Sequence, residues 1–350
     1  MTEGWNRRQF GAGMLAGAML AVPAAPVLAK PGIARSRWQP AGLAALRRRA
    51  TELGVRALVV TDAKGVILSE GAVSESSRIA SVRKSLLSAL YGMAAAEGRI
   101  RLGATLGELG VEDYTKLTPA ERGATVRDLL KARSGIYLPT SAETPAMKAA
   151  RPARGSHPPG SFWYYNNWDF NVLGEIYQRM TGEGLFAAVE HRLAKPLGWQ
   201  DFDPLQHARW SYDAENPRFP AYNIWLSARD LARFGQLFLN RGRWQGRQLV
   251  PEAWIDESTA QYSTTGRAGW GGGYGYMWWL ATDQGADPQG LPVGSFTAAG
   301  NGGRYITVFP REQIVVAVQP DEQQGKPAVP LYADPDGYTD LLRLILAAVR

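Results

Sequence analysis

The chain of 350 residues contains no cysteine and only three histidines. Without cysteine it can form no disulfide, no thiolate-bound zinc or iron–sulfur centre, and no cysteine nucleophile. His157, His191 and His207 are scattered and lack the His-x-x-x-His spacing of a helical metal site. We therefore expect no metal and no organic cofactor. Any catalysis must use serine, tyrosine, lysine or carboxylate side chains.

Strong charge clusters are also scarce. The chain has 39 Lys+Arg and 32 Asp+Glu, a net charge of +7, and Arg47–Arg49 is its only tight basic run. Because the basic residues are dispersed, we expect no nucleic-acid partner. With 45% hydrophobic and 20% charged residues, the composition is typical of a globular protein. The length predicts two domains or one large composite domain.

The N-terminus has the three-part pattern of an export signal. Arg7 and Arg8 precede a Gly/Ala-rich run that ends at Ala29. The paired arginines resemble a twin-arginine signal, so the expected partner of the precursor is the twin-arginine export machinery. The run is weakly apolar and interrupted by Pro23 and Pro26, which favours cleavage near Ala29 over a stable membrane anchor. We expect a periplasmic or secreted mature protein.

Hydrophobic periodicity predicts the order of the secondary structure elements. A helix at 43–53 and a hairpin at 57–69 come first, followed by a long helix at 82–97. Helical patterns then dominate, at 126–132, 170–181, 185–193 and 228–240. Strands are expected at 275–280, 304–309 and 314–319, and a terminal helix at 338–349. This order predicts an α/β (α+β) fold, in which terminal helices flank an antiparallel sheet and an all-helical subdomain is inserted.

The expected domain boundaries follow from that order. Residues 1–29 are the signal, 30–105 and 236–350 form a discontinuous α/β sheet subdomain, and 106–235 form the mainly helical insertion.

The first candidate catalytic element is Ser81-x-x-Lys84, at the start of the long helix. Residues three apart on a helix share a face, and a helix N-terminus favours a developing oxyanion. A lysine whose pKa is lowered by burial can take the proton of a serine nucleophile. The alternative is that Ser81 only caps the helix and Lys84 is solvated.

The second element is the aromatic segment 162–167, in which Tyr164/Asn166 and Tyr165/Asn167 both fit a Tyr-x-Asn pattern. A tyrosine beside a lysine can relay protons, and an asparagine can orient the lysine. Neighbouring residues of an extended loop point opposite ways, so one pair alone can face Ser81. Aromatic packing beneath a loop is the alternative.

The third element is the glycine-rich stretch 298–304, directly ahead of a predicted strand. Glycines at a strand edge let a substrate approach the backbone, and a free N–H there can serve as an oxyanion donor. A tight turn or bulge is the alternative. Six aromatic residues are further candidates for lining the pocket, although each is more typical of the core: Trp163, Trp168, Tyr222, Trp225, Trp278 and Trp279.

The three elements together resemble the serine β-lactamase and penicillin-binding protein superfamily. The similarity is to the branch of class C β-lactamase-related hydrolases, which includes esterases and 6-aminohexanoate-dimer hydrolases. Further matching segments are 78–87, 126–130 with Ser134-Gly135, 196–199, 226–231 and 274–279.

The resemblance implies a role for each element. Ser81 would be the acylated nucleophile, Lys84 its proton acceptor and Tyr165 the base for deacylation. The family's tyrosine lies nine residues before the Gly of a Leu-Gly pair, as Tyr165 lies before Gly174, which gives the asparagine role to Asn167.

The third motif departs from the family pattern. Asn301-Gly302-Gly303 stands where the family has Lys-Thr-Gly or His-x-Gly. The N–H groups of Ser81 and Arg304 would form the oxyanion hole. The cation that holds a β-lactam carboxylate is missing at Asn301, so penicillin-like substrates are disfavoured unless the Arg304 side chain substitutes.

The resulting hypothesis is an exported serine hydrolase that cleaves a small-molecule amide or ester through an acyl-enzyme, similar to 6-aminohexanoate-dimer hydrolases or esterases. One alternative is a β-lactamase or D,D-peptidase. Another is a non-catalytic peptide- or cell-wall-binding protein on the same scaffold.

Overall fold

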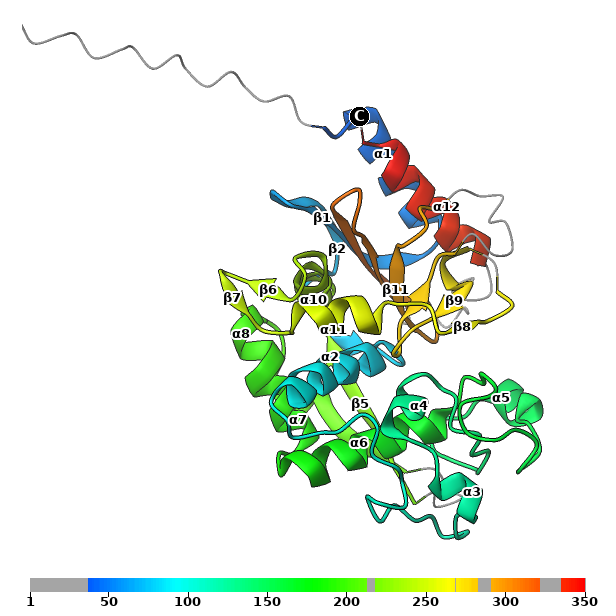
Figure 1. Cartoon of the computed structure of the whole chain (residues 1–350). Helices are drawn as coiled ribbons and strands as arrows, with labels where there is room; N and C mark the ends of the chain where they lie inside the picture. Colours follow the sequence, from blue (N-terminus) through cyan, green and yellow to red (C-terminus); the bar gives the residue numbers. More distant parts are fainter. Residues whose placement is uncertain (1–36, 213–217, 268, 283–290, 322–334, 350) are drawn as a thin grey trace, which may run out of the picture. The chain divides into compact units, whose positions relative to one another are not determined.

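An eight-stranded antiparallel sheet forms the upper part of the molecule in Figure 1, with strand order β2-β1-β13-β12-β11-β10-β9-β8. The computed structural model describes residues 37–212, 218–267, 269–282, 291–321 and 335–349. The strands are β1 (Val55–Asp62), β2 (Gly65–Gly71), β8 (Ser263–Thr264), β9 (Gly273–Tyr274), β10 (Trp279–Leu280), β11 (Phe296–Gly300), β12 (Arg304–Phe309) and β13 (Ile314–Pro320).

Helices cover both faces of this sheet. The terminal helices α1 (Pro40–Glu52) and α12 (Pro335–Ala347) lie against each other above it (Figure 1). Helix α10 (Ala228–Leu239) packs on β1, β12 and β13. A Cβ on Gly235 would lie 2.4 Å from Val315, so this glycine allows the helix to approach the sheet closely. Because both faces are covered, β12 and β13 are buried along their whole lengths and read as continuous apolar runs.

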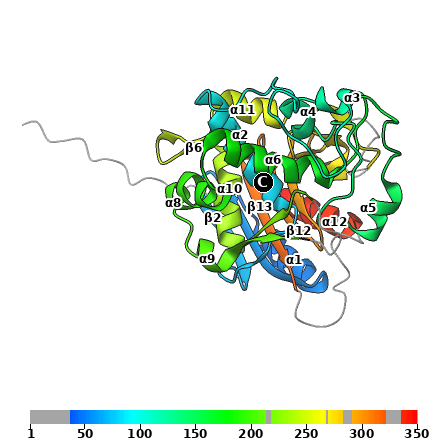
Figure 2. The ribbon, with the colours of Figure 1, turned by 90° about the horizontal axis from the view of Figure 1, so that it is seen from below.

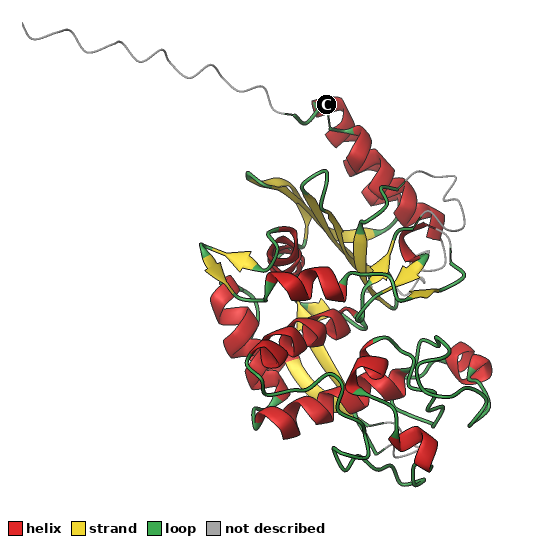
Figure 3. Ribbon diagram, in the orientation of Figure 1, coloured by secondary structure: helices red, strands yellow, loops and turns green. Residues whose placement is uncertain are grey.

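The segment between strands β2 and β8 of the large sheet is mostly helical (Figure 3). The other helices of this segment are α2 (Val82–Ala96), α3 (Pro119–Arg122), α4 (Val126–Leu130), α5 (Pro145–Ala150), α6 (Asn167–Thr181), α7 (Leu185–Ala188), the π-helical turn Val189–Ala194, α8 (Lys195–Leu197), α9 (Pro204–His207) and α11 (Glu252–Ser258). In the view from below, α4 and α11 lie on the opposite side of the molecule from α1 (Figure 2).

This segment also contains strands that the periodicity did not predict. Strands β3 (Ser77–Arg78), β5 (Ala221–Leu226) and β4 (Ala208–Ser211) form a separate three-stranded sheet, and β6 (Arg243–Trp244) pairs with β7 (Arg247–Gln248). The prediction of an all-helical insertion is therefore wrong for β4 and β5. Residues Trp38–Arg350 form one compact unit, and the subdomain boundaries stay a prediction.

The α/β fold class and most of the expected elements are confirmed. The hairpin at 57–69 is β1–β2, the long helix is α2, and β12 and β13 lie where they were expected. The single strand expected at 275–280 is wrong. Gly275 N donates to Trp278 O, and Met277 adopts a positive φ of 62°, so the chain turns tightly between β9 and β10.

The predicted signal at residues 1–29 lies outside the described residues. Among the described residues, no helix is long and apolar enough to cross a membrane.

Candidate active site

Ser81 lies at the junction between β3 and α2. The preceding residues are held in place because Ile79 N donates to Ile224 O at 3.0 Å, and Ala80 adopts the left-handed conformation with φ 47°. Such a conformation is uncommon for a residue with a side chain and occurs where surrounding structure enforces it. The Ser81 hydroxyl makes no capping hydrogen bond to the helix. The expectation of a simple N-cap therefore does not describe its side chain.

Lys84 lies one helical turn further on and is only 1% exposed. Its Nζ is 3.1 Å from Ser81 Oγ, 2.6 Å from Tyr165 Oη and 2.6 Å from Asn167 Oδ1. The alternative of a solvated lysine is thus wrong. One amine is within hydrogen-bonding distance of all three partners that the sequence singled out.

The electrostatics of this position favour the neutral amine. Burial lowers the pKa of Lys84 well below 10.5, and the neighbouring Arg83 cation lowers this pKa further. A neutral amine has two N–H groups and one lone pair. Asn167 Oδ1 can only accept, so it takes one N–H. The other N–H and the lone pair are shared between the hydroxyls of Ser81 and Tyr165, either of which can donate to Nζ. A lone pair is thereby available to accept the serine proton.

The structure distinguishes the two Tyr-x-Asn pairs. Tyr165 and Asn167 contact Lys84, whereas Tyr164 Oη donates to Met147 O at 2.8 Å. Asn166 is buried and is not among the residues that line the cavity, and its amide donates to the buried carboxyl group of Asp169 at 2.9 Å. Adjacent side chains of the segment thus point to different partners, as the alternation of an extended loop requires.

Tyr165 is fixed by aromatic neighbours. Its ring stacks on Trp279 with centroids 5.3 Å apart, and its edge contacts involve Tyr274 and Phe170. Lys84 Nζ lies 4.1 Å from the Tyr165 ring centroid and 4.3 Å from that of Phe170. This cage excludes water from the amine and accounts for its desolvation.

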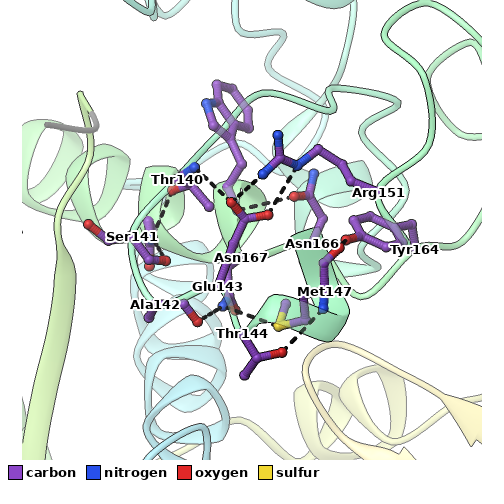
Figure 4. A network of polar contacts seen from close by, with 12 residues as sticks. Thr140, Ser141, Ala142, Glu143, Thr144, Met147, Arg151, Tyr164, Asn166 and Asn167 are labelled. Carbon is purple, nitrogen blue, oxygen red and sulfur yellow. Dashed lines mark hydrogen bonds and ion pairs between the residues drawn. The ribbon is translucent and has the colours of Figure 1, made fainter. Parts of the chain in front are cut away.

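A loop from Thr140 to Arg151, which includes α5, holds Asn167 from the other side (Figure 4). Asn167 Nδ2 donates to Ala142 O at 2.6 Å, which fixes the amide with its oxygen toward Lys84. Ala142 itself has a positive φ of 66°. Glu143 braces the loop, since it accepts from Thr140 N at 3.1 Å and pairs with Arg151 at 2.6 Å (Figure 4).

Ser81 opens onto a cavity of about 520 Å³. Tyr165, Asn167 and the loop around α5 form part of its wall. Of the six aromatic candidates, Trp163 and Trp279 line the cavity. Trp168 and Trp278 are fully buried in the core. Two lining aromatics, Trp270 and Tyr305, were not among the sequence candidates.

The 300–304 segment reaches the site differently from the expectation. A Cβ on Gly300 would lie 2.5 Å from Ile79 O, so the end of β11 lies directly against the chain before Ser81. Gly300 and Asn301 line the cavity, whereas Gly302, Gly303 and Arg304 are not among its lining residues.

The Arg304 side chain is buried and turned away from the cavity. Its guanidinium donates to Arg78 O and, at 2.8 Å, to Asn301 O. The idea that Arg304 replaces the missing cation at Asn301 is therefore not supported by its position. Arg304 instead ties the β11–β12 turn to the segment that precedes Ser81.

Sequence reasoning missed the buried support of the site. Asp169 lies beneath the Tyr-x-Asn segment, and its carboxyl group accepts from Ser134 Oγ at 2.5 Å. Burial raises the pKa of Asp169 well above its usual value. An acidic residue within an otherwise apolar helical stripe was the available signal. In the described part of the chain, no group of His, Cys, Asp and Glu side chains is arranged to hold a metal ion.

Comparison with known proteins identifies a family that this chain matches. The model of the Beta-lactamase family matches residues 43–331. The 6-aminohexanoate-dimer hydrolase of Paenarthrobacter ureafaciens is 26% identical over 147 residues, which are 40% of this chain and 36% of that protein.

Two solved structures show the same fold. A Bacillus anthracis protein named after 6-aminohexanoate-dimer hydrolase superposes with a TM-score of 0.63 at 22% identity, covering 86% of this chain and 81% of that chain. A penicillin-binding protein homologue from Caulobacter crescentus gives a TM-score of 0.62 at 17% identity, covering 89% and 99%.

Proposed function

Because the chain belongs to the beta-lactamase family, we propose that it is a serine hydrolase that cleaves an amide or ester bond through an acyl-enzyme on Ser81. The observation that carries this proposal is the position of Lys84 Nζ, desolvated and within 3.1 Å of Ser81 Oγ. The same amine contacts Tyr165 and Asn167, which completes a route for proton transfer.

In the proposed acylation step, Ser81 Oγ attacks the substrate carbonyl carbon and its proton passes to Lys84 Nζ. The proton then moves through the Tyr165 hydroxyl to the leaving amine or alcohol, and the C–N or C–O bond breaks. In deacylation, water attacks the ester on Ser81. Tyr165 removes a proton from this water, the C–O bond to Ser81 Oγ breaks, and a proton returns through Lys84 to the serine oxygen.

The oxyanion needs two hydrogen-bond donors. One is the N–H of Ser81 at the start of α2. We assign the second to the backbone at Gly300–Asn301 and not to Arg304, because Gly300 and Asn301 line the cavity and Gly300 packs against Ile79.

The substrate class within the family is also part of the proposal. A linear amide or ester is favoured over a β-lactam because the β11–β12 turn, where the resembling family holds the β-lactam carboxylate, presents no cation in this chain: Asn301 is neutral and Arg304 is turned inward. Turnover of a chromogenic cephalosporin faster than that of 4-nitrophenyl esters and 6-aminohexanoate dimer would favour the β-lactamase or D,D-peptidase alternative.

Labelling with a fluorophosphonate probe tests the nucleophile. The mature protein should be labelled, and Ser81→Ala should not. Ser85→Ala is the matched control, since Ser85 lies on the same helix and its hydroxyl donates to Met277 O. Labelling that survives in Ser81→Ala overturns the assignment. Absence of any burst with activated esters in the wild type would support the non-catalytic alternative.

Export through the twin-arginine pathway is proposed from residues 1–29 alone. Cell fractionation and N-terminal sequencing of the mature protein test it. We expect a periplasmic or secreted protein that begins near residue 30, and retention in the cytoplasm when Arg7 and Arg8 are both replaced by lysine. Export that is unaffected by this double substitution contradicts the pathway.

A further inference from the structure

The cavity beside Ser81 contains a buried cation that no carboxylate among the described residues balances. Arg83 lines this cavity and is only 3% exposed. Its Nη1 is buried, and within the described residues it has no hydrogen-bond partner. The guanidinium rests on the ring of Tyr222, with Cζ 4.4 Å from the ring centroid. This cation–π contact with Tyr222 does not supply a hydrogen-bond acceptor.

Within the part of the chain that the structure describes, no carboxylate acts electrostatically on Arg83. The groups that act on it electrostatically are Tyr222, Tyr165 and Arg78, and burial lowers the pKa of Arg83. An unpaired buried charge is costly, and buried polar groups are generally hydrogen-bonded. A guanidinium left in this condition beside a catalytic serine is explained by a ligand that supplies the missing acceptor.

The other charged residues that line the cavity are exposed or already paired, and Arg78 is one of the exposed cations. Glu143 is the acidic lining residue, and its carboxylate is already bonded to Arg151 and Thr140 N. Arg304, the side chain named as a substitute for the missing cation at Asn301, donates to backbone carbonyls instead. Arg267 lines the cavity but is exposed to solvent over the Trp279 ring.

We propose that Arg83 is the anion-binding residue of this cavity and that the substrate carries a carboxylate group, which its guanidinium binds. This inference rests on the proposed acyl-enzyme function and specifies its substrate. A planar guanidinium donates two parallel hydrogen bonds to a carboxylate. The aromatic and alanine side chains of the cavity wall would surround the apolar part of such a substrate.

Two pairs of esters that differ only in charge test the proposal. Mono-4-nitrophenyl adipate and its methyl ester place the carboxylate on the acyl side. The compounds 4-acetoxybenzoate and methyl 4-acetoxybenzoate place it on the leaving group. We expect the wild type to prefer the charged member of at least one pair in kcat/KM. Arg83→Gln should reduce that preference about 10- to 100-fold, mainly through KM, because it removes a charged hydrogen bond.

The ratio within a pair isolates binding from basicity. Arg83 also lowers the pKa of Lys84, and this effect changes the turnover of both members of a pair alike. Arg83→Lys should restore part of the preference. Arg267→Gln, the matched control, removes an exposed cation from the same cavity and should change the ratio less than threefold because water screens its charge.

Each outcome has one meaning. No preference for either carboxylate ester in the wild type, or a preference that persists in Arg83→Gln, overturns the role of Arg83. If Arg83→Gln does not fold, Arg83→Lys and competitive inhibition by adipate decide in its place, and absence of inhibition overturns the proposal. Failure of the underlying function is distinguishable, since the neutral esters would then show no turnover that depends on Ser81.

Discussion

Replacing Lys84 with methionine should alter the pH dependence of the free energy of unfolding. Burial lowers the pKa of Lys84 well below 10.5 in the folded protein, while a lysine in the unfolded chain titrates near 10.4. Between these two pKa values the unfolded state binds one more proton than the folded state. The free energy of unfolding of the wild type should therefore rise with pH between the two pKa values. The slope is about 1.4 kcal/mol per pH unit where the two states differ by one full proton.

Methionine has a similar length and cannot be protonated, so Lys84→Met removes this contribution. Urea unfolding followed by tryptophan fluorescence between pH 6 and 9 measures the effect. The stability of Lys84→Met relative to the wild type should be greatest at the acidic end and fall as the pH rises. Lys64→Met is the control, since the Lys64 side chain is exposed in the folded protein. Parallel curves for Lys84→Met and the wild type would refute the claim that Lys84 is neutral in the folded protein.

Three further substitutions test the surroundings of the nucleophile. Tyr165→Phe should lower kcat for an activated ester about 10²- to 10⁴-fold, because it removes the base that deprotonates water in deacylation, whereas Tyr164→Phe should stay near the wild type; equal losses would contradict the chosen register. Gly300→Ala should lower kcat about 10²-fold, because its Cβ would meet a backbone oxygen at 2.5 Å and displace the strand end; unchanged kinetics would contradict that packing. Asp169→Ala should lower the free energy of unfolding by about 2 to 4 kcal/mol in denaturant titrations, since it leaves the buried Ser134 hydroxyl without its acceptor; a change below 0.5 kcal/mol would contradict this role.

Local spacing was enough to place the catalytic helix. The apolar stripe after Ser81 predicted α2, and a separation of three residues predicted that Ser81 and Lys84 share a face. The residues alone could not choose between Tyr164 and Tyr165. That choice depends on which side of the loop faces α2, a tertiary contact that spans 81 residues of sequence.

The differences from expectation have the same origin. Strand β5 lies within a region of helical periodicity and is defined by pairing with β3 and β4, which are distant in sequence. The glycine-rich stretch predicts Arg304 as a residue of the site. In the structure β11 continues to Gly300, so the segment that meets the nucleophile comes earlier in the chain. The sequence could not predict that Arg83 Nη1 lacks a hydrogen-bond partner among the described residues, because this depends on which side chains the tertiary structure places around it.

The covalent intermediate tests the central claim most directly. Tyr165→Phe should be treated briefly with 4-nitrophenyl acetate at neutral pH, quenched in acid and analysed by peptide mass spectrometry. The account predicts one acetyl group on the peptide that contains Ser81, and no acetylated peptide in the double variant with Ser81→Ala. Acetylation at another residue, or release of 4-nitrophenol at the wild-type rate by Ser81→Ala, would contradict it.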